Sequence, residues 1–459
     1  MTRADRSRLP DVGPDPPFRF PRIVRHTLPN GLQVRTVEHQ TVPVVTMVVQ
    51  VEAGAVADPL GREGLAAITA DMLDEGVGSL SAIEVSEGFA RIGAQYDADV
   101  GADVMHLSLT TLSRFAERGA ALLADILVRP SLRADDFDRV RQMRLDRLRQ
   151  LKDLPSAVAE RAFLRLMYGE HPYGHLAIGT AEALGALALE DVAAFHAARF
   201  RPSGATITVA GPLSHDGLLR LVDDAFSAWS EAGTAADVQA LPEVGSPEAA
   251  SPSRLAVVPR DGAPQSELRI GHLSAQRNTP DYPALLVMNA VLGGQFVSRI
   301  NLKLREEKGY TYGARSGFDW RRGIAPFSLQ ASVHTASTAD AISDCLAELD
   351  GIRGSRPPSE REMSLAKASL TRGYPRGFET AQQVARSVAQ LALFGLPDTY
   401  FEEFVPRVHA VEVADVVRVA ERYVDPERVV TLVVGDYQAV AESLRPLGLG
   451  EPRLLPSDV

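Results

Sequence analysis

Residues 191–211 read DVAAFHAARFRPSGATITVAG, and residues 415–435 read DVVRVAERYVDPERVVTLVVG. In each stretch an aspartate opens a helical pattern that ends at an aromatic residue, a proline marks a turn, and an apolar strand runs to a glycine. The aspartate and the glycine are 20 positions apart both times (211 − 191 and 435 − 415). Because one stretch closes each half of the chain, the pair predicts two homologous halves that arose by duplication.

The elements predicted around these stretches come in blocks of strands and blocks of helices. The first half opens with a hairpin over residues 23–37 that turns at Asn30-Gly31, and it later carries helices over 113–128 and 134–152. The second half opens with a strand over 267–273. We therefore predict an α+β fold of two α/β-sandwich-like halves, each a mixed or antiparallel sheet with packed helices.

Composition predicts where these halves begin and end. Residues 231–253 are rich in Ala, Gly, Ser, Pro and acids without an apolar period, as expected of a linker. Residues 1–22 are charged and proline-rich, which predicts a flexible N-terminal arm. The predicted domains are residues 23–230 and 254–459.

The overall composition excludes several classes of protein. The chain has 459 residues and a net charge of −11, which argues against nucleic acid or an anionic membrane as a partner. Cys345 is the single cysteine, so neither a disulfide framework nor a cysteine zinc site is expected. No apolar run reaches membrane-spanning length, and no signal-like core is evident. These features predict a cytoplasmic protein, or a periplasmic one if a signal peptide was removed.

Residues 301–313, NLKLREEKGYTYG, read as a helix end followed at once by a strand. The apolar spacing predicts a helix over 297–308, and alternation after Gly309 predicts that Tyr310 and Tyr312 share one strand face. Arg305, in the last helical turn, would then converge with Tyr312 across the corner. The structural alternative is an arginine that complements the helix C-terminus beside ordinary strand aromatics.

Taken together, the two α+β halves, the NGL turn at 30–32, HPYG at 171–174 and LREEKGYTYG at 304–313 resemble the pitrilysin/insulinase family of zinc peptidases. The resemblance spans roughly residues 22–445. Active members carry an inverted zinc motif, His-x-x-Glu-His, on the first helix of the first half. Two imidazoles four residues apart hold Zn²⁺ there, and the glutamate activates water.

This sequence departs from the motif at all three functional positions. The family context, Gly64-Leu65-Ala66, is intact, but Ala67 stands for the first histidine, Ala70 for the glutamate and Asp71 for the second histidine. The later helix over 141–148 has arginines where the resemblance implies a glutamate ligand. Asp71 and Asp146 are the alternative, remnants of a weak site, but two acids without imidazole make a zinc site unexpected. We expect no cofactor in this chain.

The histidines offer one other metal alternative. His171 and His175 are four residues apart, although the resemblance explains HPYG as a structural turn. Four isolated histidines on apolar patterns are predicted to be structural: His106, His196, His272 and His334.

The resemblance also implies what the stretch at 304–313 does. In the family an Arg/Tyr pair in such a segment reaches a zinc site, where the tyrosine stabilises the oxyanion and the arginine positions substrate. The matching residues are Arg305 and Tyr312, with Tyr310 as the alternative if the register is shifted. Some bacterial members place the pair and the zinc motif on different subunits. The resemblance therefore implies a non-catalytic subunit that pairs with a zinc-motif (HxxEH) homologue to hydrolyse peptides, with zinc in the partner.

Two other readings stay open at this point. One is a catalytically inactive scaffold, like the peptidase-derived core proteins of respiratory complexes. The other is a stand-alone enzyme with a substituted metal site. Peptide is expected to bind by adding a strand to an exposed sheet edge. Three arginines that follow the corner are expected either to line the substrate chamber or to form a solvated strand face: Arg315, Arg321 and Arg322.

Overall fold

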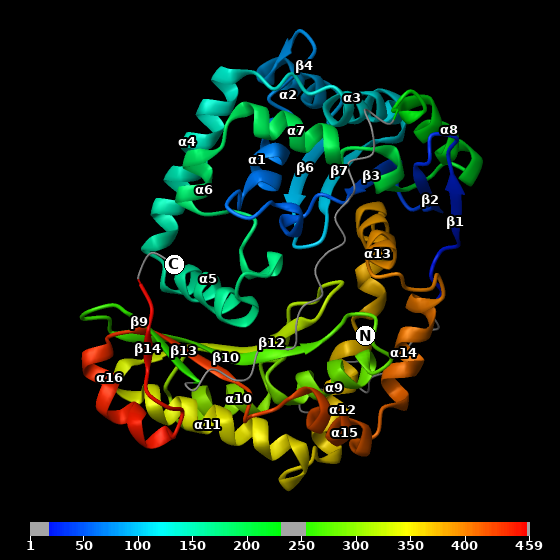
Figure 1. Cartoon of the computed structure of the whole chain (residues 1–459). Coiled ribbons are helices and arrows are strands. Elements are labelled where there is room, and N and C mark those ends of the chain that lie inside the picture. The colour runs from blue at the N-terminus through cyan, green and yellow to red at the C-terminus, as the bar shows by residue number, and fades with distance from the viewer. Residues whose placement is uncertain (1–17, 231–253, 457–459) are drawn as a thin grey trace, which may run out of the picture.

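The computed structural model describes residues 18–230 and 254–456, which form two halves with a six-stranded sheet each (Figure 1). The first sheet has the strand order β1-β2-β8-β3-β7-β6 and the second has the order β11-β12-β10-β13-β9-β14. Strands of the first sheet are β1 (Ile23–Thr27), β2 (Gln33–Glu38), β3 (Val44–Val51), β6 (Gln95–Val100), β7 (Met105–Leu112) and β8 (Ala205–Gly211). Strands of the second are β9 (Leu255–Pro259), β10 (Gln265–Ala275), β11 (Ala314–Phe318), β12 (Ala325–His334), β13 (Val430–Gly435) and β14 (Arg453–Leu454).

Helices cover both sheets. Those of the first half are α1 (Leu65–Met72), α2 (Ala82–Arg91), α3 (Ala116–Val128), α4 (Ala134–Lys152), α5 (Pro155–Tyr168), α6 (Ala181–Ala186), α7 (Leu189–Arg199) and α8 (His215–Phe226). Those of the second half are α9 (Tyr282–Leu292), α10 (Arg299–Asn301), α11 (Thr338–Asp350), α12 (Glu360–Thr371), α13 (Ala381–Leu393), α14 (Tyr400–Ala410), α15 (Val413–Tyr423) and α16 (Tyr437–Leu444). A short hairpin, β4 (Gly76–Val77) and β5 (Leu80–Ser81), lies outside the large sheets.

The internal repeat occupies the same place in both sheets. β8 pairs in parallel with β2 and antiparallel with β3, while β13 pairs in parallel with β9 and antiparallel with β10. Each of these strands follows the repeated helix, α7 or α15. The predicted α+β fold with two homologous halves is therefore confirmed, and both sheets are mixed.

Each half contributes one helix to the sheet of the other half. α13, from the second half, packs on β3 and β8, and α5, from the first half, packs on β10 and β13 (Figure 1). Both helices bury apolar residues at these contacts, such as Val384 on α13 and Val158 on α5. This exchange joins the two halves through two apolar interfaces.

The structure tests only part of the predictions for the N-terminal arm and the linker. The predicted linker, residues 231–253, and residues 1–17 of the predicted arm lie outside the described residues. For residues 18–22 the prediction of a flexible arm is wrong. Phe18 stacks on Phe378, and Phe20 is buried against Phe378 and Phe401. Apolar contact between aromatic rings outweighs the local proline-rich composition here.

Candidate functional site

Helix α1 carries the positions that the resemblance assigns to the zinc motif, and it packs against α4 and α7. Ala67 and Ala70 are buried at 3% and 2% exposure, so they contribute packing and no ligand atom. The helix begins at a side-chain cap: the Asp58 carboxylate accepts hydrogen bonds from the N–H groups of Gly64 and Ala66. His175 Nε2 lies 3.0 Å from the same carboxylate, which fixes the cap further. Helix α1 is thus capped and packed, but it lacks the His and Glu side chains of the zinc motif.

Arg144 of α4 fills the space beside these positions. Its Nε lies 2.6 Å from Asp71 Oδ2, and its Nη2 donates to the Ala67 carbonyl oxygen over 2.8 Å. The Arg144 side chain is 13% exposed, whereas the Asp71 side chain is 41% exposed, so the guanidinium is sheltered and the carboxylate is partly open to solvent. The Arg144 guanidinium therefore occupies the space in which a metal ion would need free ligands. It also neutralises Asp71, the acid at the position assigned to the second histidine.

Asp146, the other candidate remnant, points to partners on its own helix. Its carboxylate accepts a hydrogen bond from Gln142 over 3.0 Å and pairs with Arg149. Within residues 18–230 and 254–456, no group of three or more His, Cys, Asp or Glu side chains is placed to hold a metal ion. A donor set of one guanidinium-paired carboxylate without imidazole does not fit Zn²⁺.

The corner at residues 301–313 differs from the prediction in its second part. Residues Arg299–Asn301 are α-helical and Leu302–Glu307 continue as a π-helix, but Tyr310 and Tyr312 lie in a loop and not on a strand. The wider π-helical turn and Gly309, at φ = +65°, redirect the chain before β11 begins at Ala314. The prediction of one shared strand face for the two tyrosines is therefore wrong.

The two tyrosines have opposite environments. Tyr310 is half-buried against the apolar core of the second half, whereas Tyr312 is 89% exposed. The residues around Tyr312 are nevertheless held in place. The Tyr310 N–H donates to the Leu304 carbonyl over 2.8 Å, and the Thr311 hydroxyl bonds both the N–H and the carbonyl of Gly313. A fixed loop thus presents a solvent-facing phenol.

Asn301 connects this loop to the segment before α10. It is 3% exposed, its Nδ2 donates to the Phe296 carbonyl over 2.6 Å, and its Oδ1 accepts from the Ala314 N–H over 2.9 Å. Arg305 lies on the same side, with its guanidinium carbon 4.2 Å from the centre of the Phe296 ring and its Nε 3.5 Å from Glu306. The structure places Arg305 and Tyr312 on one anchored segment, each partly or fully open to solvent.

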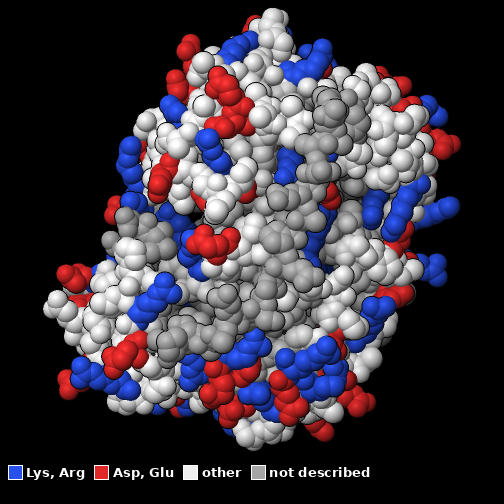
Figure 2. All heavy atoms as spheres, in the orientation of Figure 1, with Lys and Arg blue, Asp and Glu red and all other residues white. Residues whose placement is uncertain are grey.

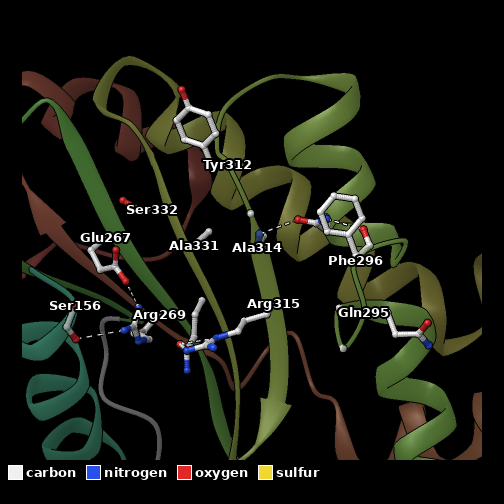
Figure 3. Close-up of a pocket in the computed structure, with 15 residues that line it drawn as sticks. Ser156, Glu267, Arg269, Gln295, Phe296, Tyr312, Ala314, Arg315, Ala331 and Ser332 are labelled. Carbon is white, nitrogen blue, oxygen red and sulfur yellow. Dashed lines mark hydrogen bonds and ion pairs between the residues drawn. The ribbon is translucent and has the colours of Figure 1, made fainter. Parts of the chain in front are cut away.

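A cavity of about 460 Å³ borders Tyr312 (Figure 3). Its walls come from the loop after α9, the start of β11, strands β10 and β12, and the first turn of α5. The lining residues are Ser156, Glu267, Arg269, Gly293, Gly294, Gln295, Phe296, Asn301, Tyr312, Gly313, Ala314, Arg315, Gln330, Ala331 and Ser332. We call this space the Tyr312 cavity. Ala67, Ala70 and Asp71 are not among its lining residues.

The HPYG segment is a junction between the halves. The Tyr173 hydroxyl donates to the Asp103 carboxylate and accepts from the Gly323 N–H over 3.3 Å. Burial, and next the Asp103 hydrogen bond, raise the pKa of Tyr173, so the phenol keeps its proton as the donor. Arg321 is buried at 4% exposure, 4.9 Å above the Tyr173 ring, and it donates to the Tyr173 carbonyl over 3.1 Å. Both expectations for Arg321, chamber lining and solvated face, are therefore wrong.

The remaining arginines and histidines that the sequence analysis named are partly structural and partly exposed. Arg322 bridges the halves through Glu52, at 3.1 Å, whereas Arg315 lines the Tyr312 cavity. The His171 ring accepts a hydrogen bond from the Tyr173 N–H and thus has a different partner from His175. His196 bonds the Leu127 carbonyl, and His272 bonds the Leu273 carbonyl and accepts from the Asp425 N–H, as predicted for structural histidines. His334 is exposed, which differs from the structural role predicted for it. Burial lowers the pKa of the His106 ring.

The sequence of residues 33–181 matches the profile described as insulinase (peptidase family M16), and residues 186–370 match the profile described as peptidase M16 inactive domain. The chain belongs to the insulinase family, M16. Solved structures agree at the level of the fold. A peptidase M16 inactive domain from Pseudomonas fluorescens superposes with a TM-score of 0.83 at 23% identity, covering 90% of this chain and 98% of that one.

Other proteins that are similar in sequence or in fold have diverse descriptions. A protein of Mycobacterium tuberculosis described as an uncharacterized zinc protease is 27% identical over 360 residues, which is 77% of this chain and 80% of that protein. A chain of complex III2 from Candida albicans has a TM-score of 0.74 at 16% identity, over 92% of this chain and 99% of that chain.

Two further features of this M16 chain are the distribution of charge on its surface and the length and apolar character of its helices. On the face drawn in Figure 2, basic and acidic side chains are interspersed, and no large field of one sign covers it. Among the helices of the described ranges, none combines the length and the apolar character needed to span a bilayer.

Two residues that organise the site, Asn301 and Arg144, carry little signal in the sequence. Asn301 lies within the corner at 301–313 without a pattern that indicates its role, and Arg144 is one of several arginines on its helix. The signal for Arg144 was its place on the helix expected to carry the last ligand. No sequence pattern indicated which of those arginines faces α1.

Proposed function

We propose that this chain is the non-catalytic subunit of a heterodimeric zinc metallopeptidase and that Arg305 and Tyr312 act in trans at the zinc site of an HxxEH-containing M16 partner. One observation carries the proposal: Tyr312 is 89% exposed on a loop whose flanking residues are all hydrogen-bonded. An exposed phenol on a loop that is anchored in this way has no packing role within its own chain. A role toward a second surface accounts for both features.

The chemistry follows from the two side chains. The Tyr312 hydroxyl would donate a hydrogen bond to the oxyanion formed from the scissile carbonyl, and Arg305 would bind backbone carbonyls of the peptide. Zinc, held by the partner, would supply Lewis acidity and an activated water. A fixed donor aimed at a developing oxyanion contributes roughly 3–4 kcal/mol to catalysis. The site of this chain, closed by Arg144, contributes no metal chemistry in this scheme.

Strand addition of a peptide at β11 is opposed by the hydrogen bonds that this edge already makes. β11 is an edge strand, but two of its outward N–H groups are occupied: Ala314 by Asn301, and Ser316 by the Gly293 carbonyl over 2.9 Å. A peptide therefore meets side chains at this edge and not a free row of backbone groups.

A scaffold role is the second candidate, and the likeness to a chain of Candida albicans complex III2 favours it. A scaffold would form a stable complex with its partner but would be indifferent to the Tyr312 hydroxyl. The enzyme-subunit proposal requires that hydroxyl.

The deciding experiment is fluorogenic-peptide hydrolysis by this chain alone, by an HxxEH homologue alone and by the mixture, with zinc quantified in each sample. The expected result is chelator-sensitive activity in the mixture only, with zinc in the homologue. A stable complex without activity would favour the scaffold. Zinc and activity in this chain alone would contradict both proposals and favour the stand-alone enzyme.

A further inference from the structure

The floor of the Tyr312 cavity carries a row of three polar side chains across three strands. Arg269 of β10 is directly opposite Gln330 of β12, and Gln330 is directly opposite Arg315 of β11. Residues directly opposite one another in neighbouring strands point to the same face of the sheet. Figure 3 shows Arg315 extending along this floor, while Arg269 bonds Glu267 and the Ser156 carbonyl.

The two arginines differ in how their charge is balanced. Arg269 is buried at 4% exposure and donates to Glu267 over 2.6 Å, with Glu160 at 3.6 Å. Its charge is therefore neutralised within the fold. Arg315 is exposed, and its Nε and Nη2 both donate to the Gln330 Oε1, at 3.3 and 3.1 Å. Among the described residues, none forms an ion pair with Arg315.

Gln330 holds Arg315 in a defined position without neutralising it. Because Gln330 Oε1 accepts both hydrogen bonds, its amide NH₂ group faces away from Arg315, and one side of the guanidinium stays open to the cavity. Guanidinium groups bind carboxylates with paired hydrogen bonds, and such charge-assisted bonds are stronger than neutral ones. A positioned arginine with an open donor edge is suited to a carboxylate.

A second cavity, of about 640 Å³, adjoins the Tyr312 cavity at this row, since Ser156, Arg269, Arg315 and Gln330 line both. Together the two cavities form one groove along the face of the sheet. Arg315 follows Tyr312 by three positions in the chain, and both residues line the Tyr312 cavity. A peptide whose scissile carbonyl is at Tyr312 thus has space to run past Arg315.

We infer that this groove selects peptides with a carboxylate near the cleaved bond and that Arg315 is the residue that recognises it. The inference rests on the proposed function for the position of the cleaved bond, but the preference for a carboxylate does not depend on activity. The carboxylate belongs to an Asp or Glu side chain or to the C-terminus of a short peptide. The recognised chemistry is the same in both cases.

The test measures binding to this chain alone, by fluorescence anisotropy with labelled decapeptides. Three matched peptides are compared: one with a central Glu, one with Gln in its place, and one with that Gln and an amidated C-terminus. The peptide with the recognised carboxylate should bind roughly tenfold more tightly than its neutral counterpart, as expected for one charge-assisted contact. Loss of affinity on Glu-to-Gln exchange identifies a side-chain carboxylate, and loss on amidation identifies the C-terminus.

Two variants separate Arg315 from general electrostatics. Arg315→Gln should abolish the preference, while Arg361→Gln, on an exposed part of α12 outside the groove, should retain it. Equal binding of all three peptides by the wild type would overturn the inference, as would a preference that survives in Arg315→Gln. Mixtures with the partner that show no cleavage, while the binding preference persists, would refute the proposed function and leave this inference standing.

Discussion

Arg144 and Asp71 form an ion pair, Nε to Oδ2 at 2.6 Å, at the position that the family resemblance assigns to a zinc ligand. The same arginine donates to the carbonyl of Ala67 on the preceding turn of α1. A guanidinium supplies positive charge and directional hydrogen bonds, so α1 and α4 are joined without a metal ion. In place of the motif side chains, this chain thus has the contacts of Arg144 with Asp71 and Ala67, and the site is not open.

Restoring the motif residues alone should therefore fail to restore zinc binding. We expect the variant Ala67→His/Ala70→Glu/Asp71→His to remain nearly zinc-free, because the Arg144 cation stays beside both histidine positions and repels Zn²⁺. Adding Arg144→Ser should raise the zinc content measured by mass spectrometry after dialysis. Arg147→Ser, on the exposed side of α4, is the matched control and should leave the triple variant unchanged. Full zinc loading of the triple variant with Arg144 intact would contradict this account.

The Tyr312 hydroxyl should matter to the rate of the assembled enzyme. Tyr312→Phe is expected to lower kcat of the complex by roughly 10²–10³-fold, because one oxyanion donor is lost. The residue is exposed, so the melting temperature should not change. Tyr310→Phe, two residues away and turned to the core, is the matched control and should keep the rate within about threefold. If Tyr310→Phe shows the large effect instead, the two roles are exchanged.

Asn301 should act as a positioning residue for the Tyr312 loop. Asn301→Ala leaves the Phe296 carbonyl and the Ala314 N–H without their partner, at a cost of about 1–3 kcal/mol in unfolding free energy. Because the loop loses its anchor, kcat of the complex should fall while KM changes little. Asn301→Asp keeps the acceptor for Ala314 and should restore part of kcat. A variant that loses stability but keeps kcat would show a purely structural role.

Asp74, just after α1, should make stability depend on pH. Burial, the main cause, and the neighbouring acids Glu75 and Asp71 raise its pKa from 3.8 to about 6. The folded state therefore holds this proton more tightly than the unfolded state, so stability is fully present below pH 3.8 and declines as the pH rises to about 6. Asp74→Asn should stabilise the protein by about 1–2 kcal/mol at pH 7.5 and by almost nothing at pH 3.5, measured by urea unfolding. Equal effects at both pH values would exclude the titration of Asp74 as the cause.

Much of the architecture was predictable because it depends on local pattern. The repeated helix–turn–strand units at 191–211 and 415–435 have their apolar spacing and turn residues within 21 consecutive positions, and they fold as β8 and β13 with equivalent neighbours. The Gly64-Leu65-Ala66 lead-in to α1 is local in the same sense. The corner at 301–313 is predicted only in part, because apolar spacing does not distinguish the π-helix over Leu302–Glu307 from an α-helix and does not show that both tyrosines lie in a loop.

The sequence by itself determined the family, the two-half organisation and the absence of the three zinc-motif side chains, since each of these is written in consecutive residues. The tertiary structure decided which arginine closes the former site, which tyrosine faces solvent, and that Arg269, Gln330 and Arg315 form one row. Those relationships join residues far apart in the chain: Asp71 and Arg144 are 73 positions apart. Side-chain placement at such separations depends on how helices and strands pack, and local periodicity carries no information on it.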